Sequence, residues 1–171
     1  GHVTGVQTCA LPIFSFQFSE LARAATPSTL TPAKSVAKDA LDTWLSIDSQ
    51  NRVTVYVGKV DLGTGTKTAL AQIAAEELSM PFGQIEMVMG DTGTTPDQWL
   101  TGAALTIQQG GSELRVAAAS ARAALIERAA QKWQVSATQL KVVDGVVVDP
   151  SDPTRRLSYG ELIGPGFELK V

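Results

Sequence analysis

Near residue 50 the sequence has two short runs rich in β-branched and aromatic residues. The runs are Trp44–Ile47 and Arg52–Val57, and a short polar segment separates them. This arrangement predicts a β-hairpin. Within the second run the valines recur at every second position, so they should lie on one face of the strand. These valines are Val53, Val55 and Val57.

Two longer segments follow the period of a helix instead. Thr66–Leu78 carries an apolar stripe and should end before Pro81, which cannot continue a helix. Ser112–Trp133 is rich in alanine, a strong helix former, and its leucines and several alanines share one face. Its charged residues fall mostly elsewhere and predict a solvated face. These are Glu113, Arg115, Arg122 and Glu127.

The remaining pattern predicts short elements and one long connection. Ile85–Met89 reads as a strand, and Leu140–Val148 as a hairpin whose Asp144-Gly145 tip suits a type I′ turn. Ser158 is a candidate cap for a last short helix through Ile163. The segment 90–111 is mostly irregular, and connections of this length are often functional. The mixed order predicts an α+β fold, a small mixed sheet with two main helices packed on one face.

Composition and charge narrow the class of protein. The 171 residues suffice for one domain with a core, and 44% hydrophobic against 18% charged residues indicates a globular chain. No apolar run is long enough to span a bilayer. The net charge is −3 and the basic residues are scattered, which disfavours nucleic acid as a partner.

Cysteine and histidine usage excludes several kinds of site. The single cysteine is Cys9 and the single histidine is His2. The rest of the chain therefore has no internal disulfide, no Cys/His zinc site and no histidine base. Any ligand must be held by backbone groups, hydroxyls, amides or carboxylates.

The beginning of the chain is set apart from the rest. Val3–Ile13, VTGVQTCALPI, resembles a translated sequencing-library adapter, so residues 1–13 are interpreted as an artefactual leader. The alternative is a natural, poorly ordered terminus. Residues 14–41 read as a linker or the remnant of a signal peptide. The compartment therefore stays open between the periplasm and the cytoplasm of a bacterium.

A glycine-rich loop is the first candidate site. Gly63-Thr64-Gly65-Thr66 stands directly before the first predicted helix, where free N–H groups and the helix dipole could face an anion. The loop matches neither the phosphate-binding loop of nucleotide hydrolases nor a dinucleotide fingerprint. A tight strand-to-helix turn is the alternative interpretation.

A threonine-rich loop is the second candidate. Thr101-Gly102-Ala103-Ala104-Leu105-Thr106 combines small residues, which let a ligand approach the backbone, with two hydroxyls. A polar surface loop is the alternative. Five carboxylates could in principle serve as acid and base, but their spacing singles out no pair and we assign none a catalytic role. These are Asp61, Glu76, Glu77, Asp91 and Asp97.

Taken together, three segments resemble a known family. They are GKVDLGTGTKTALAQIAAEEL, IEMVMGDTGTTPDQ and TGAALTIQQGGSELRVAAASARAAL. In this order they resemble the large, molybdopterin-binding subunits of molybdenum hydroxylases, of the isoquinoline 1-oxidoreductase and nicotinate dehydrogenase type within the xanthine dehydrogenase and aldehyde oxidase family. The resemblance runs from about Leu41 to the end. It implies that residues 42–171 are the incomplete N-terminal part of the molybdopterin-binding subunit and belong to a larger molybdopterin-binding domain.

The resemblance implies an activity and partners. Such an oxidoreductase hydroxylates an N-heterocycle, or oxidises an aldehyde, with oxygen from water. Its molybdopterin is usually the cytosine dinucleotide form in bacteria. Electrons leave through an iron–sulfur small subunit and in this group often pass to a cytochrome.

The resemblance also implies cofactor-contacting positions. Gly63, Thr64, Gly65 and Thr66 match one loop, in which the wider family often has glutamine at the position of Thr64. A contact through the backbone N–H of Thr64 is therefore expected. Thr101, Gly102 and Thr106 match a second loop, where the family often carries serine at the position of Ala103 or Ala104.

The family's catalytic glutamate lies in a glycine-rich motif that does not occur in this chain. We therefore expect a fragment of the subunit that is inactive alone and carries no bound cofactor, because half a site does not offset the cost of ordering a large ligand. The alternative function is a small self-contained domain that binds an anion or a partner and has no catalytic activity.

Overall fold

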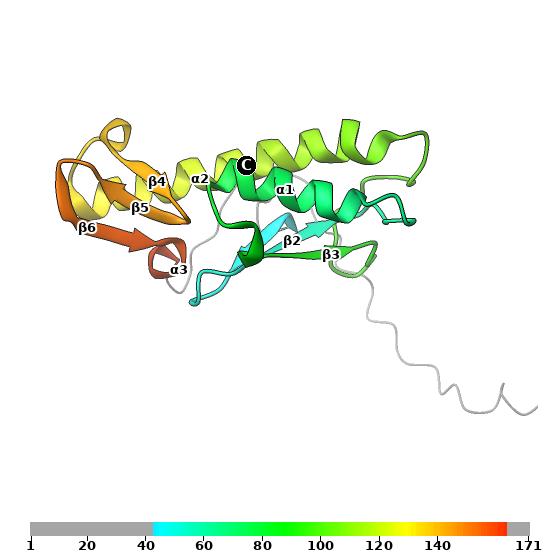
Figure 1. Cartoon of the computed structure of the whole chain (residues 1–171), viewed down its shortest axis with the longest axis horizontal. Coiled ribbons are helices and arrows are strands. Elements are labelled where there is room, and N and C mark those ends of the chain that lie inside the picture. Colours follow the sequence, from blue (N-terminus) through cyan, green and yellow to red (C-terminus); the bar gives the residue numbers. More distant parts are fainter. Residues whose placement is uncertain (1–42, 164–171) are drawn as a thin grey trace, which may run out of the picture. The chain divides into compact units, whose positions relative to one another are not determined.

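The computed structural model describes residues 43–163, which form helices and two small sheets (Figure 1). The interpretations of residues 1–13 and 14–41 lie outside the described residues. All described residues belong to one unit, Ala33–Val171.

The first sheet is mixed and contains the predicted hairpin. β1 (Leu45–Ile47) pairs antiparallel with β2 (Val53–Val57), and β2 pairs parallel with β3 (Ile85–Met89). The inward valines of β2 are fully buried, as their spacing predicts. The hairpin turn is closed by the Asp48 carboxylate, which accepts hydrogen bonds from the backbone N–H groups of Gln50 and Arg52, each at 2.9 Å.

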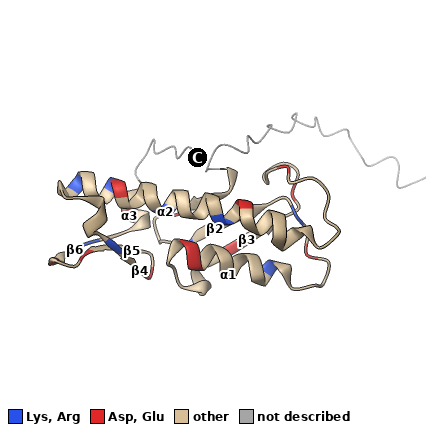
Figure 2. Cartoon of the chain, turned by 90° about the horizontal axis from the view of Figure 1, so that it is seen from above, with Lys and Arg blue, Asp and Glu red and all other residues tan. Residues whose placement is uncertain are grey.

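The two main helices are α1 (Thr66–Leu78) and α2 (Ser112–Trp133), with the predicted bounds. α1 is the crossover between β2 and β3, which is why these neighbours are parallel. Both helices lie on the same side of the mixed sheet and run side by side (Figures 1 and 2). Fully buried leucines from both helices form the core. They are Leu70, Leu78, Leu114 and Leu125.

A second sheet follows α2, where we expected one sheet only. β4 (Lys141–Val143), β5 (Val146–Asp149) and β6 (Asp152–Ser158) pair antiparallel in that order. The tip between β4 and β5 has positive φ at Asp144 (51°) and Gly145 (73°), as a type I′ turn requires. The strand β6 was not predicted, because this largely polar edge strand lacks an apolar alternation.

The short helix α3 (Tyr159–Leu162) joins this second sheet to α1. Ser158 caps it as predicted, in a reciprocal arrangement with Glu161. The Tyr159 side chain is fully buried, and its hydroxyl donates to the carbonyl oxygen of Leu78 at 2.7 Å. This bond satisfies a carbonyl at the end of α1, which has no partner within the helix.

The segment between β3 and α2 is not irregular throughout. Its last part, Thr106–Gly111, forms a π-helical turn (η4) that continues directly into α2. Two single 3₁₀ turns, η3 (Phe82–Gln84) and η5 (Ala137–Gln139), complete the elements. Among the described residues no helix is long and apolar enough to cross a membrane.

Candidate functional site

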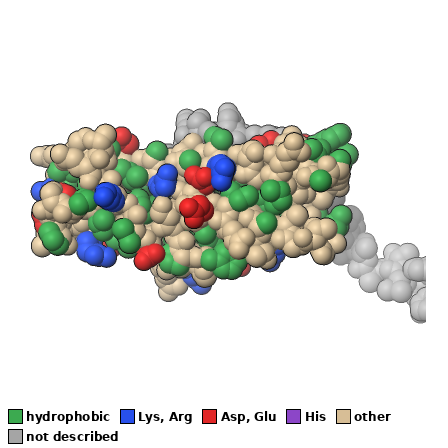
Figure 3. Space-filling view, turned by 45° about the horizontal axis from the view of Figure 1, so that its top comes forward, with side chains coloured by type: hydrophobic (Ala, Val, Ile, Leu, Met, Phe, Trp, Pro, Cys, Tyr) green, Lys and Arg blue, Asp and Glu red, His purple; other side chains and the backbone are tan. Residues whose placement is uncertain are grey.

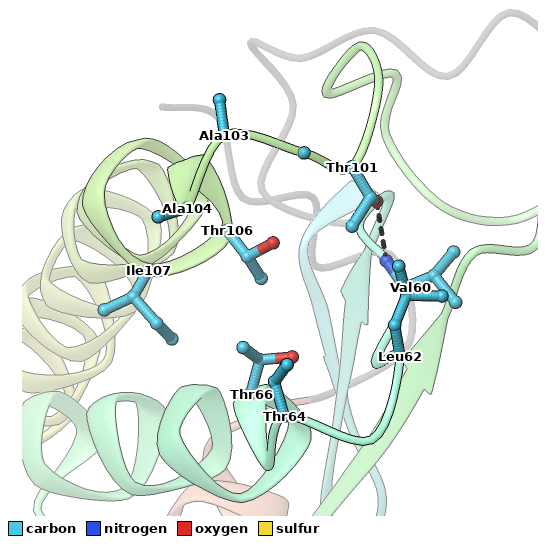
Figure 4. A pocket seen from close by; sticks show the side chains of 10 residues that line it. Val60, Leu62, Thr64, Thr66, Thr101, Ala103, Ala104, Thr106 and Ile107 are labelled. Carbon is cyan, nitrogen blue, oxygen red and sulfur yellow. Dashed lines mark hydrogen bonds between the residues drawn. The ribbon is translucent and has the colours of Figure 1, made fainter.

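A cavity of about 300 Å³ lies where the glycine loop meets the threonine-rich loop (Figure 4). The beginnings of α1 and η4 both face it, so segments that are about 40 residues apart in sequence form opposite walls. Five of the seven residues predicted to contact a cofactor line this cavity. They are Thr64, Thr66, Thr101, Gly102 and Thr106. Gly63 and Gly65 do not line it, but they shape the turn that carries Thr64.

The glycine loop is closed by a carboxylate of the chain itself. Asp61 accepts hydrogen bonds from the backbone N–H groups of Gly63 at 2.9 Å, Thr64 at 3.0 Å and Lys67 at 3.0 Å. Gly63 and Gly65 have φ of 86° and 75°, which only glycine adopts readily, and this lets the turn wrap around the carboxylate.

The prediction that this loop offers free N–H groups is therefore wrong for Gly63 and Thr64, and the Lys67 N–H in the first turn of α1 is engaged in the same way. The Thr64 N–H, which was expected to contact a cofactor, is already engaged by Asp61 in this conformation. The pKa of Asp61 is lowered, mainly by the hydrogen bond from the Lys67 N–H and further by those from Thr64 and Gly63. An ionised side chain thus occupies the place at the start of α1 where a bound anion would lie.

Threonine hydroxyls are the polar side-chain groups on the cavity walls. The Oγ1 atom of Thr66 is buried and has no hydrogen-bond partner among residues 43–163. Thr106 is buried on the opposite wall, and Figure 4 shows both hydroxyl-bearing side chains directed into the space between the loops. A buried hydroxyl without a partner is unfavourable, so Thr66 is a group that a ligand would satisfy.

The rim of the cavity is apolar and exposed. Val60, Leu62 and Ile107 line it, and Leu62 is 72% exposed. Trp99 and Leu100, in the loop before Thr101, are also exposed. Figure 3 shows hydrophobic side chains at the end of the described part where these loops lie. The site therefore combines hydroxyls inside with apolar groups at its mouth.

A second set of hydrogen bonds, which the sequence did not predict, ties the two loops together. The buried ammonium of Lys59 donates to the carbonyl oxygens of Gln98 at 2.6 Å and Leu100 at 2.8 Å. The N–H of Val60 donates to Thr101 Oγ1 at 2.9 Å (Figure 4, dashed line). The end of β2 and the threonine-rich loop thus form one cross-linked wall.

Gln98 connects this wall to α2. Its side-chain oxygen accepts from the Gly58 N–H at 2.9 Å, and its side-chain nitrogen donates to Glu113 Oε2 at 2.6 Å. Glu113 is therefore not simply part of a solvated face. Arg122 also differs from that prediction, because its guanidinium donates to Ser79 Oγ at 3.1 Å.

Several glycines near the site allow protein segments, not a ligand, to approach one another. A Cβ atom at Gly58 would overlap the carbonyl oxygen of Pro96. A Cβ at Gly110 would lie 3.3 Å from Lys59 Cγ, and one at Gly111 3.1 Å from Ile73 Cδ1. Gly110 and Gly111 thus bring the start of α2 against Lys59 and α1.

The threonine-rich loop contains strained backbone. Trp99, Ala103 and Ala104 have φ of 62°, 50° and 58°, in the left-handed region. Each such residue costs about 1–2 kcal/mol. Hydrogen bonds to a charged group stabilise by about 1.5–3 kcal/mol each. The two bonds from Lys59 are thus of the size needed to hold this loop.

Three of the remaining candidate carboxylates have structural roles. Asp91 Oδ1 accepts from the Gly93 N–H at 2.8 Å and Asp97 Oδ1 from the Trp99 N–H at 2.8 Å, so each pins a turn. Glu77 pairs with Arg115 across the two helices at 2.8 Å. Within residues 43–163 no three side chains gather in a way that could hold a metal ion.

Comparison with known proteins shows the family to which this chain is related. The sequence model of one protein family, the molybdopterin cofactor-binding domain, matches residues 21–169. One subunit of the nicotinate dehydrogenase of Pseudomonas putida is 38% identical over 80% of this chain and 11% of its own length. The beta subunit of isoquinoline 1-oxidoreductase from Brevundimonas diminuta is 31% identical over 82% of this chain and 19% of its own length.

Solved structures share the fold. The quinoline 2-oxidoreductase structure from Pseudomonas putida 86 superposes with a TM-score of 0.61 and 24% identity, over 74% of this chain and 17% of that one. The described α+β arrangement is thus that of a larger known architecture. The chain spans less than a fifth of the length of each relative named here. The match over most of its residues shows that the chain belongs to the molybdopterin cofactor-binding domain family of the molybdenum hydroxylases.

Proposed function

We propose that the cavity between the two loops contributes one wall of a molybdopterin site in a longer oxidoreductase subunit. The observation that carries the proposal is the buried, unpartnered Oγ1 of Thr66 in a cavity whose opposite wall carries Thr106. Hydroxyls can both donate to and accept from the edge of a heterocycle. The residues present therefore fit such a cofactor.

Each wall has a defined part in this proposal. Thr66 and Thr106 would bind polar atoms of the cofactor from opposite sides. Thr101 orients its loop, because its hydroxyl accepts the Val60 N–H. Val60, Leu62 and Ile107 would exclude water once covered by a neighbouring segment. When bound, the cofactor's molybdenum supplies the redox chemistry.

The activity proposed for the parent subunit follows its relatives. It is the hydroxylation of an N-heterocycle, or the oxidation of an aldehyde, with oxygen from water. The names nicotinate dehydrogenase and isoquinoline 1-oxidoreductase support this choice. We further propose the cytosine dinucleotide form of the cofactor, an iron–sulfur small subunit as the electron acceptor and a cytochrome beyond it. Both of those relatives are named as subunits, which supports a multi-subunit assembly.

The alternative, a self-contained anion-binding domain, has less support. Its anion would need the N–H groups of the glycine loop and of the first turn of α1, and Asp61 accepts those of Gly63, Thr64 and Lys67. Purification of the chain followed by molybdenum and pterin assays tests whether the site is incomplete in this chain. We expect essentially no bound cofactor, because half a site does not offset the cost of ordering it. Stoichiometric cofactor would contradict the incomplete site.

The site itself is tested in a complete subunit. Residues 42–171 would replace the matching segment of the Pseudomonas putida relative, followed by measurement of molybdenum and pterin per subunit. Thr66→Val and Thr106→Val keep the shape and remove one hydroxyl each, so each should reduce the content on the order of threefold to tenfold. Thr68→Val, on an exposed position of α1, is the matched control. Unchanged content in both test variants would refute the role of the cavity.

A further inference from the structure

Lys59 is the one lysine of the described residues that is fully buried, and its surroundings are unusual for a charge. No carboxylate of residues 43–163 lies within 4.0 Å of its ammonium, whose acceptors are two backbone carbonyls. Buried charges are normally paired, because removal from water is unfavourable. A lysine held in this way needs a reason other than an ion pair.

The acceptors point to that reason. They are the carbonyls of Gln98 and Leu100, which flank Trp99 in the strained loop directly before Thr101. Carbonyl groups that turn inward to one ammonium fix the orientation of their peptide planes. The position of Thr101 and of the following turn is thus set from Lys59, across 39 to 41 residues of sequence.

We propose that Lys59 is a positioning residue, whose ammonium fixes the threonine-rich wall of the cavity at its distance from the glycine loop. Two neighbouring hydrogen bonds hold the same loop: the Val60 N–H donates to Thr101, and the Gly58 N–H donates to the Gln98 side chain. Of these groups Lys59 alone carries a charge, so its bonds are the strongest of the set. The importance of this wall for cofactor binding rests on the proposed function, but the positioning by Lys59 can be tested without a cofactor.

The first measurement uses the unaltered 171-residue chain and nuclear magnetic resonance of the lysine ammonium. A hydrogen-bonded, buried ammonium exchanges its protons slowly with water and shows couplings through the hydrogen bonds to its acceptor carbonyl carbons. We expect one such lysine signal, Lys59, coupled to the carbonyls of Gln98 and Leu100. A Lys59 ammonium that exchanges as fast as those of exposed lysines overturns the proposal. This measurement stands even if a variant fails to fold.

The second measurement asks whether the effect is local. Lys59→Met keeps the length and apolar stem but removes the donors, and Lys141→Met makes the same change at an exposed position of β4. We expect exchange of the Val60 and Leu105 amide hydrogens to accelerate on the order of tenfold in Lys59→Met, with the centre of α2 changing less than about twofold. The Trp99 indole signal should shift in the same variant only.

Two results would overturn the assignment. Equal acceleration throughout the core would make Lys59 a general stability residue, and no acceleration at Val60 and Leu105 would show that the wall keeps its position without the ammonium. Neither result depends on molybdenum content. Failure of this inference is therefore distinguishable from failure of the proposed cofactor site.

Discussion

The contact between the end of β2 and the loop before the cavity leaves no room for a side chain at Gly58. An ideal Cβ there would overlap the Pro96 carbonyl oxygen and come within 3.1 Å of the Gln98 nitrogen, and both contacts are with backbone. Gly58→Ala must therefore push two backbone segments apart. The φ of Gly58 lies outside the left-handed region, so the alanine itself is not strained.

The magnitude follows from three contributions. Overpacking costs about 1–3 kcal/mol, and the lost bond from the Gly58 N–H to the Gln98 side chain about 0.5–1.5 kcal/mol. The lower entropy of alanine in the unfolded chain offsets about 0.4–1 kcal/mol. The net expectation is a loss of about 2–3 kcal/mol in the free energy of unfolding. With urea dependences of about 1–3 kcal/mol per molar, the midpoint should fall by roughly 1–2 M.

Urea unfolding followed by circular dichroism measures this change, and Gly83→Ala is the matched control. Gly83 lies in η3, a Cβ there meets no atom within 4 Å, and its φ is not in the left-handed region. Its midpoint should stay the same or rise slightly. Equal midpoints for both variants would refute the close approach at Gly58, as would a Gly58→Ala chain as stable as the original.

Two further predictions concern single side chains. The lowered pKa of Asp61 means that its carboxylate stabilises the fold above its unfolded pKa of about 4 and that this contribution is lost as pH falls through the lower folded value. The nuclear magnetic resonance signal of the Thr64 amide should therefore shift on acidification in the original chain and stay constant in Asp61→Asn. A Thr64 signal that does not change with pH in either chain would contradict the hydrogen bonds from the glycine loop to Asp61. Tyr159→Phe leaves the Leu78 carbonyl without its partner and should lower the free energy of unfolding by about 1–2 kcal/mol. In the control Tyr56→Phe, whose hydroxyl makes an exposed 3.3 Å bond, the urea midpoint should barely change.

The sequence predicts the elements whose burial follows a regular period. α1, α2 and β3 have the expected bounds because one face of each meets the core along its whole length. β6 could not be found in this way. Its residues are strand because β5 offers a free edge for pairing, and that partner is visible only in three dimensions.

The cavity was predictable in part, but on other grounds. Loop composition marked the two loops as candidate sites, and the family resemblance then gave the positions. The structure brings five of these residues to one cavity: Thr64, Thr66, Thr101, Gly102 and Thr106. Their role toward a cofactor stays a prediction. The pairing of the loops was not predictable, because two of its acceptors are backbone carbonyls, and a carbonyl is present at every residue whatever its side chain.

The sequence pattern does indicate that Lys59 is buried. The alternation of Val53, Val55 and Val57 extends by one more step of two residues to Lys59, which lies just after β2 and continues its buried face. A lysine in phase with three buried valines predicts a buried ammonium, and a buried ammonium requires acceptors. A partner loop could thus be expected from the sequence, though not which loop.

Asp61 and Lys59 together determine what the cavity can recognise. Asp61 accepts N–H groups of the glycine loop that would otherwise attract an anion, and Lys59 engages two carbonyls of the opposite loop that would otherwise attract a cation or a donor. The side chains that line the walls carry hydroxyls or are apolar. Such a surface favours a neutral, polar-edged heterocycle over a free phosphate. In this chain the glycine-rich turn before α1 is therefore not an open anion site, because Asp61, two residues before the first glycine, accepts the N–H groups that an anion would need.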